Sequence, residues 1–98
     1  NLPIVSVVGN NGAWNQTTQG VLRRGGKGLA TYLSQATNYA KIMEGMGGHG
    51  ERVSDPAAIR PALERAFASG KPALLDVVID PTVSYGTMGG RSREQRQY

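Results

Sequence analysis

Apolar residues gather in two short runs, one near each end of the chain. The first run covers residues 4–8 and the second covers residues 73–79, and both are rich in valine, isoleucine and leucine. Near-continuous apolar runs of this length indicate strands that are buried on both faces, as in a parallel sheet. Turn residues follow the first run at positions 9–12. The pattern therefore predicts strands at 4–8 and 73–79.

Between these runs, apolar positions change to the spacing of helices. Asn38 is a good N-cap for a helix over residues 39–46. A second helix is predicted to begin at Ser54-Asp55-Pro56 and to stop at Gly70. The inner faces expected for the two helices are Tyr39, Ile42, Met43 and Met46 in the first, and Ile59, Leu63, Ala66 and Phe67 in the second.

The remaining segments carry weaker signals. A short helix is expected over residues 13–21, with a surface loop over 20–38. Residues 51–53 suggest a short polar strand or a connector, and His49, among glycines, suggests a connector. From Ser84 onward the sequence has the composition of a flexible tail.

Strands that alternate with helices indicate an α/β fold with parallel pairing and flanking helices. Two main strands are too few for a complete sheet, because each would keep an open apolar edge. The chain also starts without Met, directly before a strand. We therefore expect it to be a piece of a longer protein, with further strands supplied by sequence before Asn1 or by a partner.

Composition narrows the classes of partner. The 98 residues carry a net charge of +4 with an isoelectric point near 9.9, and cysteine is absent. A basic balance suits nucleic acid, a membrane surface or a phosphorylated small molecule. The few aromatic residues are not interleaved with the basic runs, so no nucleic-acid partner is expected. We find no membrane-spanning run or signal peptide, and the lack of cysteine favours a reducing, cytoplasmic location.

The loop after the first strand has the residue types of an ion site. In open α/β sheets, ligands bind beyond the carboxyl ends of the strands, where Asn10-Asn11-Gly12 lies. A helix that follows would add backbone donors for an anion. Asparagine and backbone carbonyls are hard oxygen ligands that suit Mg²⁺ or Ca²⁺. The same three residues are also a common turn sequence, so the loop alone does not decide between the two interpretations.

Residues 2–14 resemble the second half of the motif of thiamine-diphosphate enzymes, in which Asn-Asn or Asn-Asp and a glycine follow an upstream Gly-Asp-Gly. Residues 39–53, 55–63 and 70–81 resemble, in order, the segments that complete the same domain. The resemblance implies that residues 1–83 are the C-terminal part of a parallel-sheet thiamine-diphosphate-binding domain. Residues 84–98 would be a flexible basic tail.

The resemblance also assigns roles. It implies that Asn10 ligates Mg²⁺ through its side chain and Gly12 through its carbonyl, and that Asn11, Ala13 and Trp14 complete the cofactor-binding set. The cofactors would be thiamine diphosphate and Mg²⁺, with chemistry through the C2 ylid. The resemblance further implies that the activating glutamate and the aspartate ligand lie outside this chain. The segment alone is therefore expected to be inactive and to work with the rest of the enzyme, in a homodimer or homotetramer with the cofactor between subunits.

The tail gives a clue to the branch of the family. Arg91 and Ser92 lie in a Gly-Arg-Ser segment that resembles the C-terminal lid of 2-hydroxyacyl-CoA lyases and oxalyl-CoA decarboxylases. Their hydrogen-bond donors suit the carbonyl and phosphate oxygens of an acyl-CoA. The resemblance thus predicts a carbon–carbon lyase or decarboxylase acting on acyl-CoA substrates. Acetolactate-synthase-like and benzaldehyde-lyase-like carboligases remain open, as do a non-catalytic homologue and a basic binding module.

Overall fold

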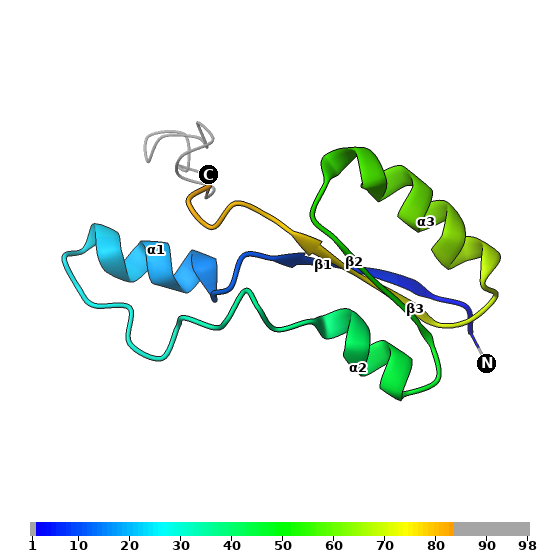
Figure 1. The fold of residues 1–98 in the computed structure, drawn as a ribbon. Helices are drawn as coiled ribbons and strands as arrows, with labels where there is room; N and C mark the ends of the chain where they lie inside the picture. The colour runs from blue at the N-terminus through cyan, green and yellow to red at the C-terminus, as the bar shows by residue number, and fades with distance from the viewer. Residues whose placement is uncertain (1, 84–98) are drawn as a thin grey trace, which may run out of the picture.

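A computed structural model describes residues 2–83 as an α/β unit (Figure 1). Its elements, in chain order, are β1 (Val5–Asn10), α1 (Asn15–Arg23), α2 (Tyr39–Gly45), β2 (His49–Val53), the 3₁₀ turn η1 (Pro56–Ala58), α3 (Ile59–Ala68) and β3 (Ala73–Val78). The predicted fold class, a small parallel sheet with flanking helices, is confirmed.

The three strands form one parallel sheet in the order β1-β3-β2. β3 lies in the centre, with Ala73 opposite both Val5 and His49 at one end. At the other end Asn10 is opposite Val78. Helices α2 and α3 lie on opposite faces of the sheet, and α1 projects beyond the carboxyl ends of the strands (Figure 1). The loop after β1 thus lies at the edge where ligands of parallel sheets bind.

Small side chains let the helices approach the sheet closely. Ala62 and Ala66 of α3 are buried in the same core as Leu75, which is fully buried at the centre of β3. On the other face, a Cβ at Gly50 would come within 2.1 Å of the carbonyl oxygen of Ala40. Any side chain at position 50 would therefore push α2 away from β2. The core cluster as a whole consists of Val53, Ala62, Ala66, Ala73, Leu75 and Val77.

Strand β1 differs from its prediction. It begins one residue later than expected, at Val5, and continues to Asn10. It is also exposed, not buried on both faces: Val7 keeps 55% of its surface accessible. The physical reason is its place at the edge of the sheet, since β3 is its one partner strand among residues 2–83. The other predicted strand, β3, lies in the centre of the sheet and does show the expected burial.

The predicted inner faces of the two helices are partly wrong. Met46 is 78% exposed and follows the end of α2, and Ile42 is also exposed, whereas Ala40 is the buried residue of this helix. Phe67 of α3 is 67% exposed although its neighbour Ala66 is buried. The prediction placed mostly large apolar residues on the sheet side, with Ala66 as the one alanine. In the structure the buried residues of the two helices are all alanines: Ala40, Ala62 and Ala66.

A third strand occupies a segment predicted to be partly a connector. β2 includes His49 and Gly50 and continues to Val53. The glycines around His49 concealed the strand, because glycine usually marks turns. The pairing of β2 with β3 leaves His49 half-buried in the sheet and not in a loop.

Two further predictions concern membrane helices and the tail. Among residues 2–83, no helix is long and apolar enough to cross a membrane. The tail over 84–98, with Arg91 and Ser92, lies outside the described residues.

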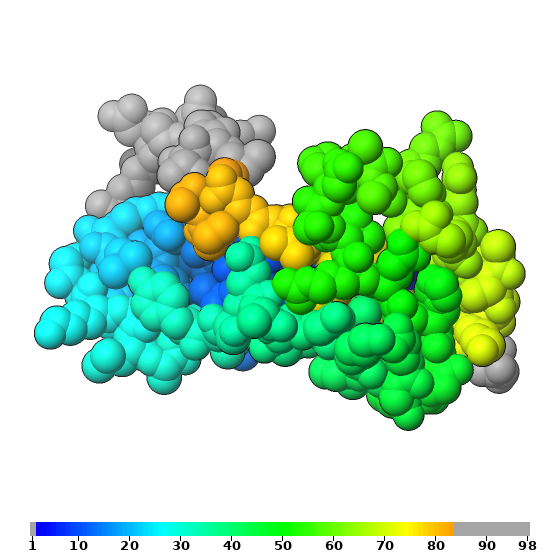
Figure 2. All heavy atoms as spheres, in the orientation of Figure 1, coloured from blue at the N-terminus to red at the C-terminus, as the bar shows by residue number. Residues whose placement is uncertain are grey.

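The segment after β3 contacts α1, because the side-chain amide of Asn15 donates to the carbonyls of Pro81 (3.2 Å) and Val83 (3.3 Å). Figure 2 shows this segment, in orange, over the junction between α1 and the sheet.

Candidate functional site

Asn10 is the last residue of β1, and its side chain is held from both sides. The residue is 3% exposed. Its Nδ2 donates to the carbonyl of Thr37 at 3.0 Å, and its Oδ1 accepts from the N–H of Gly12 at 3.1 Å. Because an amide donates only through nitrogen and accepts only through oxygen, these two bonds fix which end faces the loop. Oδ1 therefore faces the loop and keeps a second lone pair.

Gly12 provides the second predicted oxygen. It has φ of +69°, in the left-handed region that favours glycine. Its carbonyl accepts from the N–H of Leu33 at 2.7 Å. A carbonyl oxygen has two lone pairs, so one remains for a further donor or a cation. The Leu33 bond holds the loop against the segment that precedes α2.

The other predicted residues shape the same loop. The side-chain oxygen of Asn11 accepts from the N–H of Ala13 at 3.2 Å. Ala13 forms an antiparallel bridge with Tyr32, and the N–H of Trp14 donates to the carbonyl of Thr31 at 2.8 Å. The backbone donors of Ala13 and Trp14 are thus committed within the chain. Trp14 occupies the N-cap position of α1 without a side-chain capping bond, and its side chain remains largely exposed.

All five predicted residues line one pocket of about 290 Å³. The pocket lies at the carboxyl end of β1, and its walls are Val8, Gly9, Asn10, Asn11, Gly12, Ala13, Trp14, Leu33 and Tyr39. Apolar atoms dominate the walls, with the loop amides as the polar part. A concave site of this composition is typical of a small-molecule or cofactor pocket.

The donor atoms fit a hard cation that also binds phosphate. The pocket offers amide and backbone oxygens, and the described residues contain no group of three His, Cys, Asp or Glu side chains able to hold a metal. Mg²⁺ commonly takes few protein ligands and completes its shell with water and phosphate oxygens. Asn10 and Gly12 could therefore hold Mg²⁺ as one half of a site. Further ligands would have to come from other parts of the protein.

Asp80 is the first carboxylate after β3, and it accepts hydrogen bonds from its near neighbour Thr82. Its Oδ1 accepts from the hydroxyl (2.6 Å) and the N–H (2.7 Å) of Thr82. The hydrogen bond from the Thr82 hydroxyl, and then that from its backbone N–H, lower the pKa of Asp80. The group therefore stays negatively charged at neutral pH, with one oxygen already engaged.

The sequence did not predict a network of hydrogen bonds that contacts Asn10. The carbonyl of Thr37, which accepts from Asn10, also accepts from Arg52, and the side chain of Gln35 donates to the carbonyl of Asn10 at 3.1 Å. Arg52 in turn pairs with the buried carboxylate of Asp76. One signal could have revealed this set: Asp76 is a single charge inside the apolar run of β3. Buried charges are usually paired, so Asp76 predicts a cationic partner.

Comparisons with known proteins indicate the family of the chain. Residues 1–77 match the family described as "Thiamine pyrophosphate enzyme, C-terminal TPP binding domain". The acetolactate synthase large subunit IlvG of Mycobacterium tuberculosis is 47% identical over 85 residues, 87% of this chain. The 2-hydroxyacyl-CoA lyase of Arabidopsis thaliana and the oxalyl-CoA decarboxylase of Escherichia coli are each 34% identical over 90 residues, covering 83% and 92% of this chain. The matches span only 15–16% of the length of these three relatives.

Proposed function

The chain belongs to the thiamine pyrophosphate enzymes, as part of their C-terminal TPP-binding domain, and from that premise we propose that residues 10–12 hold Mg²⁺ against the diphosphate of the cofactor. The observation that carries the proposal is that Asn10 and Gly12, each with an oxygen that keeps a second lone pair, line the same pocket. The side-chain oxygen of Asn10 and the carbonyl oxygen of Gly12 both belong to the loop at the carboxyl end of β1. Thiamine diphosphate is the cofactor of this domain family, and Mg²⁺ is its usual partner metal.

Each residue of the loop has a distinct part in this proposal. Asn10 and Gly12 would hold the metal through their oxygens, and Asn11 stabilises the turn through its bond to Ala13. Trp14 contributes its ring to the wall of the pocket. An apolar wall next to the charges lowers the local dielectric, which strengthens the attraction between cation and phosphate. The chain thus binds and orients the cofactor, and we assign no proton transfer to it.

The carbon–carbon chemistry belongs to the cofactor. When bound, thiamine diphosphate supplies a nucleophilic carbon and accepts the electron pair left when a bond to a carbonyl carbon breaks. The chain provides only part of what this needs. We propose that the rest of the enzyme supplies the remaining metal ligand and the activating glutamate, within a homodimer or homotetramer that binds the cofactor between subunits.

For the reaction, we favour an acetolactate-synthase-like carboligation of 2-oxo acids. The support is the 47% identity to a mycobacterial acetolactate synthase, against 34% for the acyl-CoA enzymes over a similar length. In such a reaction two pyruvate ions and one proton give one acetolactate ion and CO₂. The bond between carboxylate and carbonyl carbon breaks in one pyruvate, and a new carbon–carbon bond forms to the carbonyl of the other.

The second candidate is cleavage of a 2-hydroxyacyl-CoA or decarboxylation of oxalyl-CoA. Matches to a lyase and a decarboxylase of this kind over 83% and 92% of the chain support it. Arg91 and Ser92, predicted to contact the acyl-CoA, would distinguish this candidate, because a carboligase for 2-oxo acids has no phosphate-rich substrate for them to bind. A benzaldehyde-lyase-like carboligase is a further member of the carboligase alternative.

A product assay separates these candidates. The full-length enzyme that contains this chain is incubated with thiamine diphosphate and Mg²⁺ and offered pyruvate, oxalyl-CoA or a 2-hydroxyacyl-CoA in turn. We expect acetolactate and CO₂ from pyruvate, and little turnover of either thioester. Release of formyl-CoA from oxalyl-CoA, or of an aldehyde and formyl-CoA from the hydroxyacyl thioester, would favour the second candidate. Turnover of none of them, without cofactor binding, would indicate a non-catalytic homologue or a binding module.

A further inference from the structure

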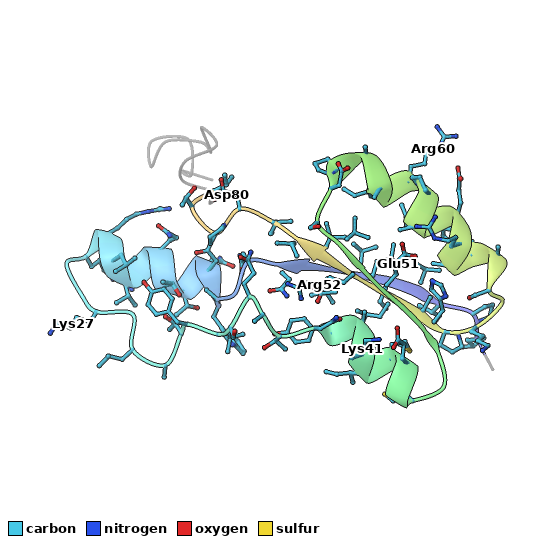
Figure 3. All side chains as sticks on the ribbon, viewed as in Figure 1. Lys27, Lys41, Glu51, Arg52, Arg60 and Asp80 are labelled. Carbon is cyan, nitrogen blue, oxygen red and sulfur yellow. The ribbon has the colours of Figure 1, made fainter. Side chains whose placement is uncertain are left out.

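A partly buried ion pair connects the centre of the sheet to the loop at residues 10–12. The side chain of Asp76 on β3 is fully buried, and its Oδ2 accepts from Nη1 of Arg52 on β2 at 2.8 Å. The same oxygen accepts from the N–H of Tyr39, the first residue of α2, at 3.0 Å. Figure 3 shows the Arg52 side chain between the sheet and the segment that leads into α2.

Arg52 divides its donors between the carboxylate and two backbone carbonyls. Nη1 also donates to the carbonyl of Thr37 at 2.7 Å, and Nη2 donates to the carbonyl of Gln35. The planar guanidinium presents several N–H groups in fixed directions, so one side chain can hold all three acceptors. Arg52 therefore fixes the segment 35–37 in front of β3.

This segment in turn determines how Asn10 is oriented. The carbonyl of Thr37 accepts from Nδ2 of Asn10 as well as from Arg52. Gln35 donates from its side chain to the carbonyls of Asn10 (3.1 Å) and Ile79 (2.9 Å), which joins the ends of β1 and β3. If Thr37 moved, the Asn10 amide could rotate by a half-turn and turn its NH₂ group toward the cation. The Thr37 carbonyl, together with the N–H of Gly12, thus selects the rotamer that presents oxygen.

Stability alone does not account for the ion pair. The carboxylate of Asp76 is removed from water, while the Arg52 side chain keeps 27% of its surface accessible. Burying a charge is costly, and replacement of buried pairs by apolar residues is often neutral or stabilising. Here the second carboxylate oxygen of Asp76 is buried without a hydrogen-bond partner, which adds to the cost. The ion pair also holds the segment 35–37, which contacts the side chain of Asn10. A pair of apolar residues could not hold that segment in the same way.

We propose that Arg52, held by Asp76, is a positioning residue for the Mg²⁺ half-site: through the Thr37 carbonyl it fixes the amide of Asn10 with its oxygen toward the metal. The inference rests on the proposed function, because it needs Asn10 to be a metal ligand. Arg52 itself does not touch the metal or the cofactor. It acts through the backbone carbonyl of Thr37, so its loss should change the affinity of the enzyme for Mg²⁺.

The test is a Mg²⁺ titration of the full-length enzyme at saturating thiamine diphosphate, with Arg52→Lys as the variant. Lysine keeps the charge beside Asp76, but its single ammonium cannot serve the carboxylate and both carbonyls in the same geometry. We expect the Kd for Mg²⁺ to rise about tenfold to a hundredfold, as is typical when a partner of a metal ligand is lost. Activity should recover at high Mg²⁺, which a general loss of structure would not allow.

Arg65→Lys is the matched control. Arg65 pairs with Glu51 on the outer side of β2 and its side chain is half-exposed, so the same substitution there should leave the Kd for Mg²⁺ unchanged. A second variant, Arg52→Met with Asp76→Asn, removes both charges and keeps an acceptor for the N–H of Tyr39. It should also weaken Mg²⁺ binding. All proteins are measured where circular dichroism shows native helix content.

The outcomes separate the two proposals. Weaker Mg²⁺ binding by both Arg52 variants, with the control unchanged, supports the positioning role. Wild-type affinity in either folded Arg52 variant overturns it while leaving the proposed function intact. Absence of Mg²⁺ binding in the wild-type enzyme would overturn both.

Discussion

At the scale of single residues, Gly12 meets two constraints at once. Its φ of +69° lies in the region that residues with a side chain rarely adopt. A Cβ at this position would also lie 3.0 Å from both the backbone nitrogen and the Cβ of Gln35. Gln35 cannot easily move, since its side chain joins the ends of β1 and β3. The glycine is needed for conformation and for space.

Gly12→Ala should therefore destabilise the loop and weaken Mg²⁺ binding. A left-handed conformation costs a residue with a Cβ about 1–2 kcal/mol, and the contact with Gln35 adds to this. Thermal unfolding and Mg²⁺ titration of the full-length protein measure both effects. Gly45→Ala is the control, because a Cβ there meets nothing within 4 Å at the end of α2. Equal losses in the two variants would contradict this explanation.

At the scale of elements, an ion pair joins α3 to β2. Glu51 of β2 accepts from Nε of Arg65 at 3.1 Å and from its Nη2, and Nε2 of His49 lies 3.7 Å from Glu51 Oε2. The hydrogen bond from Arg65 lowers the pKa of Glu51 below the usual 4.5. Partial burial opposes this shift, while the charge of Arg65 and the nearby His49 add to it. Glu51 is therefore favoured in its charged form when the protein is folded.

The stability that this pair contributes should depend on pH. A carboxyl group with a lower pKa in the folded state stabilises the fold above its unfolded pKa, and loses this contribution as the pH falls through the folded value. For Glu51 the loss begins near 4.5 and continues below it. Arg65→Met should reduce the fall in melting temperature over this acid range.

Arg60→Met is a fitting control for the pH series. It removes the same charge from the same helix, but its partner Glu64 forms an i,i+4 pair within α3 that is mostly exposed. Such pairs contribute little to stability. The melting temperatures of both variants would be followed by circular dichroism from about pH 6 to pH 3, across the carboxylate range. A similar acid slope in the two variants would argue against a special role for Glu51.

At the scale of the whole molecule, the order of elements was largely predictable from sequence. The apolar run at 73–79 correctly predicted a strand, found over Ala73–Val78, because a short apolar run with β-branched residues suits a buried strand. Its central place in the sheet was not predicted. Asn38 was correctly identified as the cap of α2, where its Oδ1 accepts from the N–H of Lys41. The exposure of Met46 and Phe67 was not predictable by periodicity, which locates an apolar stripe but not the neighbour that it faces.

The candidate site also has a part that was predictable from the sequence and a part that was not. The loop at residues 10–12 was predictable because a short run of sequence carries its turn chemistry. The network behind it was not, since Arg52 and Asp76 are 24 positions apart and meet only through the pairing of β2 with β3. The sequence alone also gave no sign that the carbonyl of Thr37 would connect Arg52 with Asn10.

The central claim is that the loop from Asn10 to Gly12 binds the metal and diphosphate of thiamine diphosphate. Calorimetric titration of the full-length protein with thiamine diphosphate, in Mg²⁺ or in a chelator, tests it most directly. The account predicts tight binding to the wild-type protein with Mg²⁺, much weaker binding with chelator, and loss of the Mg²⁺ effect in a folded Asn10→Ala variant. Binding that is equal with and without Mg²⁺, or unchanged in Asn10→Ala, would contradict it.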